Sequence, residues 1–386
     1  MASNTLSEGS RGSASRGFAG HVTIVLPHRE AFGPPGAGAV AMVVRRLAAG
    51  PSRYKPLVIG PPFGGPAFPG IPFLPAPRLP WLPLTPTLRY AADVARVLAP
   101  LPAGLIEVHN KPDVALWLAR LFPRRRVLLV LHNDPRTMRG ARSPRARRVL
   151  LDRLAGIATV SDFVHRALLE GLAQPPRRAP VVVHNALDPA EVPAPLPPAG
   201  RDPVILFAGR VVPDKGPDLF IAACAKAMPH LPGWRAEMIG ADGFSAAAPD
   251  SEFIRGLRPA AAAAGVVLHG ARPHAEVLRA MSRAAIVVVP SRWQEPFGLT
   301  ALEAMACGAA LVCSGRGGLA EVMEDAGLLI DPEDLDAFAG TLLRLAGDAG
   351  LRAALSAAGV ERARSQFSVA GAVARLDGLR DQASRL

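Results

Sequence analysis

The chain has 386 residues, 49% of them hydrophobic and 20% charged, with a formal net charge of +12. This length exceeds what one core usually supports, so we expect two domains of roughly 200 residues each. No apolar run reaches the ~18 residues of a membrane span, and three cysteines, an odd number, predict reduced thiols in a cytoplasm.

The first domain is predicted to cover residues 21–198, after a disordered tail at 1–20 that is rich in Ser, Gly and Arg. An alternating apolar run at 21–27 predicts its first strand, and a glycine-rich loop leads into a helix at 39–49. Residues 61–86 are rich in proline, which excludes a helix or a central strand. The aromatic residues of this segment either pack over the domain or contact lipid or an acceptor; they are Phe63, Phe68, Phe73 and Trp81.

Short apolar runs at 105–108, 127–131, 157–160 and 181–183 predict further strands, with helices between several of them. This alternation indicates an α/β fold with a doubly wound parallel sheet, whose ligands gather at the carboxyl ends of the strands. His109, His132 and His184 follow three of these strands. They lie on separate strands without ligand spacing, so we predict no zinc site.

A proline-rich linker at 186–202 precedes a second domain, predicted over 199–367. Its strands are expected at 204–210, 236–240, 266–270, 286–289, 311–314 and 327–332. The motif Ser291-Arg-Trp-Gln-Glu-Pro-Phe-Gly-Leu-Thr-Ala-Leu-Glu303 reads as a strand end, a turn and a helix start, with Thr300 and Glu303 as a capping box. A helix N-terminus at a strand end is an anion site.

Two carboxylates beside that site, Glu295 and Glu303, can each accept two hydrogen bonds from the hydroxyls of a sugar or ribose. The alternative is that Glu303 only caps its helix and Glu295 is a solvated loop residue.

The segment 295–303, followed by Ala-Met-Ala-Cys-Gly, resembles the glutamate-seven-residues-glutamate motif of the retaining glycosyltransferases of family 4. These enzymes have the GT-B fold, two Rossmann-like domains facing each other across a cleft. The resemblance implies that Glu295 binds donor-sugar hydroxyls and that Glu303 holds the nucleotide ribose. It also implies that the start of the helix supplies donor-binding backbone groups, at Phe297, Gly298, Leu299 and Thr300.

The spacing Gly209-Arg210-x4-Lys215-Gly216 resembles the family's phosphate clamp, in which Arg210 and Lys215 neutralise the donor diphosphate. By the same resemblance, the backbone at Arg272 meets the base. The loop at Gly38 approaches the donor phosphate, although the first of the family's paired glycines is replaced by Ala37.

His132, in Leu131-His-Asn-Asp-Pro135, resembles a histidine that faces the donor sugar; a purely structural histidine is the alternative. Asp134 is a candidate to assist the acceptor hydroxyl. The catalytic set implied by the resemblance is His132, Arg210, Lys215 and Glu295, acting with retention and without a metal or other cofactor. Residues 368–386 are expected to form a helix that crosses back to the first domain.

A dense arginine cluster suggests contact with an anionic membrane, unless it is only the solvated face of a helix. It comprises Arg124, Arg125, Arg126, Arg136, Arg139, Arg142, Arg145, Arg147 and Arg148. No aromatic residue interrupts it, so we expect no specific nucleic acid partner.

The predicted partners are thus a UDP- or GDP-sugar and a glycan or lipid-linked acceptor. The predicted place of action is the synthesis of bacterial lipopolysaccharide or exopolysaccharide, in the cytoplasm or on the inner face of its membrane. The alternatives are a soluble small-molecule acceptor, a nucleotide-sugar epimerase with the same fold, and a non-catalytic nucleotide-sugar-binding protein.

Overall fold

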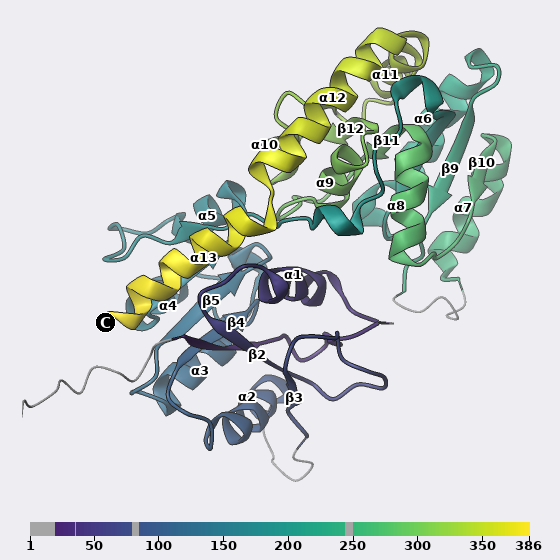
Figure 1. The fold of residues 1–386 in the computed structure, drawn as a ribbon. Coiled ribbons are helices and arrows are strands. Elements are labelled where there is room, and N and C mark those ends of the chain that lie inside the picture. The colour runs from purple at the N-terminus through teal and green to yellow at the C-terminus, as the bar shows by residue number, and fades with distance from the viewer. Residues whose placement is uncertain (1–19, 35, 79–84, 244–249) are drawn as a thin grey trace, which may run out of the picture.

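The computed structural model describes residues 20–34, 36–78, 85–243 and 250–386, and these form two lobes, each built on a parallel sheet (Figure 1). The predicted tail therefore lies almost wholly outside the described residues, and so does Trp81. The predicted boundary at residue 198 falls between the last strand of one sheet and the first strand of the other.

The sheet of the first lobe has the strand order β3-β2-β1-β4-β5-β6-β7 in the described part of the chain. The strands are β1 (His21–Val25), β2 (Lys55–Gly60), β3 (Phe73–Pro75), β4 (Leu105–His109), β5 (Val127–Leu131), β6 (Gly156–Thr159) and β7 (Val181–Val182). The helices between them are α1 (Ala39–Ala49), α2 (Pro86–Leu98), α3 (Pro112–Leu121), α4 (Pro144–Arg153) and α5 (Asp162–Leu169). The central strands β4, β5 and β6 are fully buried, as expected for a sheet covered on both faces.

The sheet of the second lobe has the order β10-β9-β8-β11-β12-β13. Its strands are β8 (Asp202–Ala208), β9 (Arg235–Ile239), β10 (Val266–Leu268), β11 (Ala284–Val289), β12 (Ala310–Ser314) and β13 (Gly327–Ile330). Its helices are α6 (Pro217–Ala227), α7 (Glu252–Ala263), α8 (His274–Arg283), α9 (Leu299–Ala306), α10 (Leu319–Met323), α11 (Leu335–Gly347) and α12 (Ala349–Gln366). In both sheets the strand order reverses direction at the first strand, which places a ligand crevice at the carboxyl ends of the strands.

The last helix, α13 (Val369–Ser384), leaves the second lobe and packs on the first, where the chain ends (Figure 1). It lies directly on β6, because a Cβ added at Gly156 would be 2.7 Å from Leu379 Cδ1. Deeper in this contact, Arg380 of α13 is 2% exposed and forms an ion pair with Glu107 of β4.

The proline-rich segment packs down on the first lobe. The ring centroids of Phe68 and Phe73 lie 5.2 and 5.6 Å from that of Phe32, and Phe63 stacks edge-on with Phe73. Phe68 is therefore part of the core of the first lobe, and Phe63 and Phe73 are partly buried against it. The short strand β3 lies at the sheet edge, where proline is tolerated.

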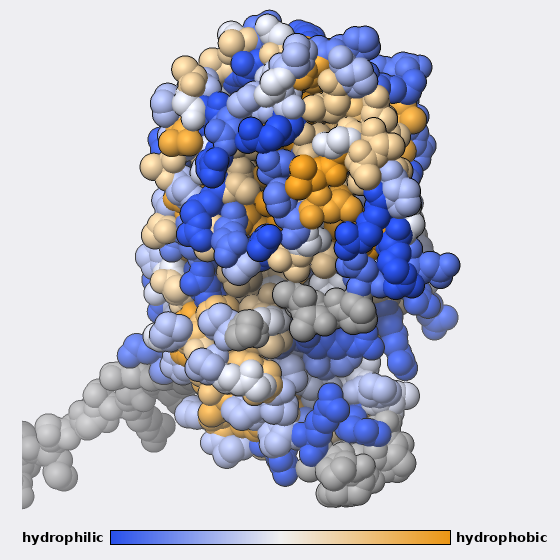
Figure 2. Space-filling model, turned by 90° about the vertical axis from the view of Figure 1, so that its right-hand side faces the viewer, coloured by the Kyte–Doolittle hydropathy of each residue, from blue (hydrophilic) through white to orange (hydrophobic). Residues whose placement is uncertain are grey.

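The arginine cluster does not form one free basic face. Arg147 is buried and donates hydrogen bonds to backbone carbonyls, including that of Leu168, while Arg136 pairs with Asp134 and Glu170. Among the described residues, no helix has the length and apolar character needed to cross a bilayer. Figure 2, seen from the side of α7 and β10, shows hydrophobic residues only in small groups between hydrophilic ones.

Candidate active site

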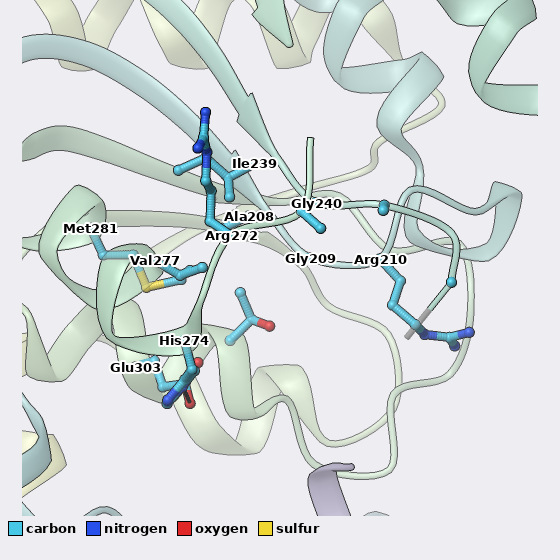
Figure 3. A pocket seen from close by; sticks show the side chains of 14 residues that line it. Ala208, Gly209, Arg210, Ile239, Gly240, Arg272, His274, Val277, Met281 and Glu303 are labelled. Atoms are coloured by element: carbon cyan, nitrogen blue, oxygen red, sulfur yellow. Dashed lines mark hydrogen bonds and ion pairs between the residues drawn. The ribbon is translucent and has the colours of Figure 1, made fainter. Parts of the chain in front are cut away.

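A cavity of about 310 Å³ opens at the carboxyl ends of β8 and β9 (Figure 3). Its lining includes Gly209, Arg210, Gly240, Arg272, His274, Thr300 and Glu303. The loops after the two strands approach closely, because a Cβ at Gly240 would lie 1.8 Å from the carbonyl oxygen of Gly209. The volume is at the lower end of the ~300–1,000 Å³ range of small-molecule sites.

Two arginines give the cavity a positive charge. Arg210 and Arg272 lie on different sides of it (Figure 3), both are exposed, and the structure shows no ion pair for either within its described part. Guanidinium groups that have no protein partner can bind phosphate oxygens through charge-assisted hydrogen bonds. The cavity is therefore suited to a phosphorylated ligand.

Glu303 lines the cavity but does not form a capping box. Helix α9 begins at Leu299, its N-cap is Gly298 with φ of +106°, and no side chain caps it. Thr300 is therefore already inside the first turn. The Glu303 carboxylate instead lies 2.8 Å from His274 Nε2 and 3.8 Å from the guanidinium of Arg46, which α1 of the first lobe contributes. The predicted capping box is wrong because the left-handed glycine sets the helix start two residues earlier.

Lys215 and Glu295, predicted to act together, are in contact. The Lys215 ammonium is hydrogen-bonded to Glu295 Oε1, which also accepts a 2.5 Å hydrogen bond from Ser291 Oγ. Glu295 is only 6% exposed, so its buried negative charge is stabilised by both Lys215 and Ser291. Neither residue lines the cavity described above. Glu295 lies in the loop that leads into α9, whose Thr300 does line the cavity, and Lys215 reaches Glu295 from the turn at Pro213–Lys215 before α6.

The loop between Glu295 and α9 is held by close backbone contacts. Gly318 N–H donates a 2.6 Å hydrogen bond to the Glu295 carbonyl, and a Cβ at Gly298 would lie 2.5 Å from Leu319 Cδ2. The side chain of Phe297 is buried and packs on His184 and Phe367. Only backbone groups of Phe297, Gly298 and Leu299 are thus suited to the donor role proposed for them.

The first-lobe candidates do not line this cavity. At Gly38, the N-terminus of α1 is occupied by Glu30, whose carboxylate accepts from Ala41 N–H at 3.2 Å. Burial raises the pKa of Glu30, opposed by hydrogen bonds from the Ala41 and Gly38 amides. Asp134 is bound by Arg136 and caps the turn at Pro135–Thr137, so its carboxylate already has a structural role.

The three strand-end histidines do not converge. His109 Nδ1 and His132 Nε2 are 2.9 Å apart, whereas His184 Nε2 lies 2.9 Å from Glu321 Oε1. The Glu321 carboxylate, from α10, also accepts from the Asp162 and Phe163 amides at the N-terminus of α5. Asp162, His184 and Glu321 have the spacing of a possible cation site, but the Glu321 oxygens here join the two lobes.

Sequence reasoning missed Arg46, His274 and Glu30 as neighbours of the predicted site residues. Each is joined to its partner by tertiary structure alone: Arg46 and Glu303 are on different lobes, and His274 is 29 residues from Glu303. No motif signal marks such pairs.

Comparison with known proteins assigns the second lobe to a family. Residues 190–362 match the family model described as Glycosyl transferases group 1. The second lobe is thus similar in sequence to the group 1 glycosyltransferases. Glu295, Glu303, Arg210 and Lys215 all lie inside the matched segment.

Two curated relatives support the match. The chain is 34% identical over 187 residues to a D-inositol 3-phosphate glycosyltransferase of Segniliparus rotundus, covering 47% of this chain and 39% of that protein. It is 29% identical over 267 residues to the putative glycosyltransferase YtcC of Bacillus subtilis, covering 64% of each. The matches thus span less than two thirds of the length of these relatives.

Solved structures match over nearly the whole chain. Sucrose-phosphate synthase from Thermosynechococcus elongatus has a TM-score of 0.74 at 19% identity, covering 94% of this chain and 98% of that one. Anabaena HepE in complex with UDP-glucose has a TM-score of 0.72 at 20% identity, covering 95% and 100%. At these identities the likeness concerns the fold. The fold predicted from the sequence, GT-B with two Rossmann-like lobes, is confirmed.

Proposed function

We propose that this protein is a retaining glycosyltransferase that moves a sugar from a nucleotide-diphosphate donor to a hydroxyl. The observation that carries the proposal is the cavity at the ends of β8 and β9. It places around one space the carboxylate of Glu303 and two arginines, Arg210 and Arg272, that form no ion pair with any residue the structure describes. The arginines suit a diphosphate, and the carboxylate suits the vicinal hydroxyls of a ribose. HepE, a structural neighbour, binds UDP-glucose, which supports a donor of this class.

Transfer would leave a diphosphate, so the chemical task is to stabilise developing negative charge. Arg210 and Lys215 supply positive charge, and α9 adds free N–H groups at its N-terminus. These groups can perform this task without a metal ion, and metal-independent transfer is part of the proposal. Glu295 would bind hydroxyls of the donor sugar, which requires Lys215 to turn from Glu295 toward the phosphates when the donor enters.

Retention would follow a same-face mechanism in which the leaving phosphate takes the acceptor proton. Without a donor, the buried carboxylate of Glu295 pairs with Lys215 and accepts a hydrogen bond from Ser291 Oγ. With the donor bound, sugar hydroxyls would take the place of Lys215, so Glu295 serves as a binding group. A cleft between two lobes can close over the donor and exclude the water that would otherwise hydrolyse it.

For the acceptor, we propose a soluble small molecule. One similar protein, D-inositol 3-phosphate glycosyltransferase, is named for a small acceptor, and a structural neighbour, sucrose-phosphate synthase, is named for a small product. Support for a membrane-bound, lipid-linked acceptor is weaker, because several arginines of the cluster are used inside the lobe. Co-sedimentation with liposomes tests this: binding that depends on anionic lipid would favour the glycan or lipid-linked acceptor of polysaccharide synthesis instead.

The substitution that tests the site is Lys215→Met, with Lys226→Met as its matched control. Lys226 is a half-exposed lysine that pairs with Asp336 on the surface, away from the cavity. We expect Lys215→Met to weaken donor binding at least tenfold and to abolish transfer, because one charge-assisted phosphate contact is worth about 1.5–3 kcal/mol. Lys226→Met should behave as wild type. Equal turnover in both variants would refute the assignment.

Product analysis separates the remaining alternatives. An epimerase would change the sugar of the donor without an acceptor, and a binding protein would hold the donor unchanged. Release of nucleoside diphosphate together with a new glycosidic bond of retained configuration is the outcome that the proposal requires.

A further inference from the structure

Beneath His132, a line of buried polar side chains leads to the C-terminal helix. His132 Nε2 lies 2.9 Å from His109 Nδ1, and His109 Nε2 lies 3.0 Å from Glu107 Oε1. The carboxylate of Glu107 is held by Arg380 of α13, with Nε 2.9 Å from Oε2 and Nη2 3.0 Å from Oε1. Glu107 and His109 have no exposed surface, and His132 is 8% exposed.

The protonation state of Glu107 is fixed by its partners, Arg380 and His109. Burial alone would raise the pKa of Glu107, but the charge of Arg380 and the hydrogen bond from His109 outweigh it and lower the pKa to about 2. Glu107 is therefore a carboxylate at neutral pH. Because a carboxylate can only accept hydrogen bonds, the proton between it and His109 must sit on His109 Nε2.

The charge on Glu107 also decides which ring nitrogens of His109 and His132 carry protons. A neutral imidazole has one N–H, so His109 Nδ1 carries a lone pair and accepts from His132 Nε2. Burial, with a contribution from His109, lowers the pKa of His132 well below its ordinary value, so His132 is also neutral. Its single N–H is thus used on Nε2, and Nδ1 is left with a lone pair. The structure shows no hydrogen-bond partner for this Nδ1 among the residues it describes.

We infer that Glu107, His109 and Arg380 are positioning residues that hold His132 in the Nε2–H tautomer, so that Nδ1 accepts a hydrogen bond from a hydroxyl of the substrate. The inference rests on the proposed function and on the resemblance by which His132 is expected to face the donor sugar. It specifies which group is the donor in that contact. A sugar hydroxyl can donate a hydrogen bond to His132 Nδ1, whereas a carboxylate oxygen at the same place would face the Nδ1 lone pair and be disfavoured.

The arrangement also gives α13 a role in the site. Without Arg380, Glu107 would be a buried carboxylate lacking its cation, and protonation would let it donate to His109. That would reverse the order of protons through His109 and turn His132 Nδ1 into a donor. A residue 273 positions along the chain from Glu107 thereby sets the direction of the hydrogen bond that His132 Nδ1 can form.

The direct test is ¹⁵N NMR of the histidine rings in the full-length wild-type protein, with the His132 signals assigned from their loss in His132→Asn. We expect protonation at Nε2 of both His132 and His109. Protonation of His132 at Nδ1 would overturn the inference. This measurement needs neither a nucleotide sugar nor a substitution of Glu107 or Arg380.

The variant Glu107→Gln tests whether the Glu107 carboxylate determines which nitrogens of His109 and His132 are protonated. Its single oxygen would satisfy Arg380 and its amide would face His109, so we expect the proton of His132 to move to Nδ1. Glu237→Gln is the control, since Glu237 pairs with His269 Nε2 at 3.0 Å in the second lobe and outside this line. An unchanged His132 tautomer in folded Glu107→Gln would contradict the role of Glu107.

Ligand binding separates this inference from the proposed function. In Glu107→Gln, affinity for the nucleotide sugar should fall about tenfold, the value of one misdirected hydrogen bond, while affinity for the nucleoside diphosphate alone stays unchanged. Equal loss for both ligands would contradict the inference. If the wild type binds neither ligand, the proposed function fails, and the NMR result still decides the proton order.

Discussion

The ion pair between Arg380 and Glu107 predicts a large and specific loss of stability. Both side chains are at most 2% exposed, and Arg380 also donates a 2.9 Å hydrogen bond to Asp377. In Arg380→Met, a side chain of similar length fills the space but leaves the Glu107 carboxylate buried without its cation. Breaking a buried pair from one side costs about 3–5 kcal/mol. This is a large part of the 5–15 kcal/mol that stabilises a typical protein.

The same helix provides a matched control. Arg53 pairs with Asp381 of α13 at 2.7 Å, but the Arg53 side chain is 66% exposed. Exposed pairs contribute about 0.2–1 kcal/mol because solvent screens them and the side chains lose entropy. Arg53→Met should therefore cost less than about 1 kcal/mol while also removing an ion pair between α13 and the first lobe.

Urea denaturation with circular dichroism, together with limited proteolysis of α13, measures both variants. We expect a clear fall in the unfolding midpoint and early cleavage of α13 in Arg380→Met, and near-wild-type behaviour in Arg53→Met. Equal stability of the two variants would refute the argument that the buried pair anchors α13.

Three further outcomes follow from the structure. The pKa of Glu107 is lowered to about 2, so its stabilisation is fully present above its ordinary value near 4.5 and is lost as pH falls from there toward 2. Wild type should lose about 3 kcal/mol over that range from this group, and Arg380→Met much less. Gly298→Ala should weaken donor binding and destabilise the second lobe by about 1–3 kcal/mol, because φ is +106° and the new Cβ meets Leu319. Glu303→Gln should lower the preference for a ribonucleotide over its deoxyribose analogue about tenfold, if the carboxylate binds ribose hydroxyls.

The first two predictions have a control, and each of the three has a result that would contradict it. The acid titration is read as the difference between wild type and Arg380→Met, and parallel stability curves would contradict it. For the glycine, Gly256→Ala in α7 meets no atom within 4 Å and should be neutral or stabilising; equal effects at both glycines would count against the strained helix start. For Glu303, unchanged discrimination between the two nucleotides would place the ribose elsewhere.

The fold was largely predictable because the second lobe follows simple patterns. Buried parallel strands such as β11 and β12 are short, mostly apolar runs with turn residues nearby, a pattern that can be recognised in the sequence. Strand β2 was not predicted, and neither was β3, which lies inside a proline-rich segment where only an edge position is possible.

Motifs that resemble those of a known family can relate site residues even when these are far apart in the sequence. Lys215 and Glu295 were expected in one cleft, and the structure brings them into contact. The neighbours His274 and Arg46 of Glu303 were not found, since nothing in local sequence encodes a contact between lobes. The capping box failed for a local reason that pattern reading cannot see, the left-handed backbone of Gly298.

The central claim is that the cavity between Arg210 and Glu303 binds a nucleotide-diphosphate sugar. The measurement that tests it most directly is calorimetric titration of the full-length protein with a panel of UDP- and GDP-sugars, in parallel with Arg210→Gln. We predict that at least one nucleotide sugar binds the wild type and binds Arg210→Gln at least tenfold more weakly, the loss of one charge-assisted contact. Absence of binding by every nucleotide sugar, or equal binding by both proteins, would contradict the account.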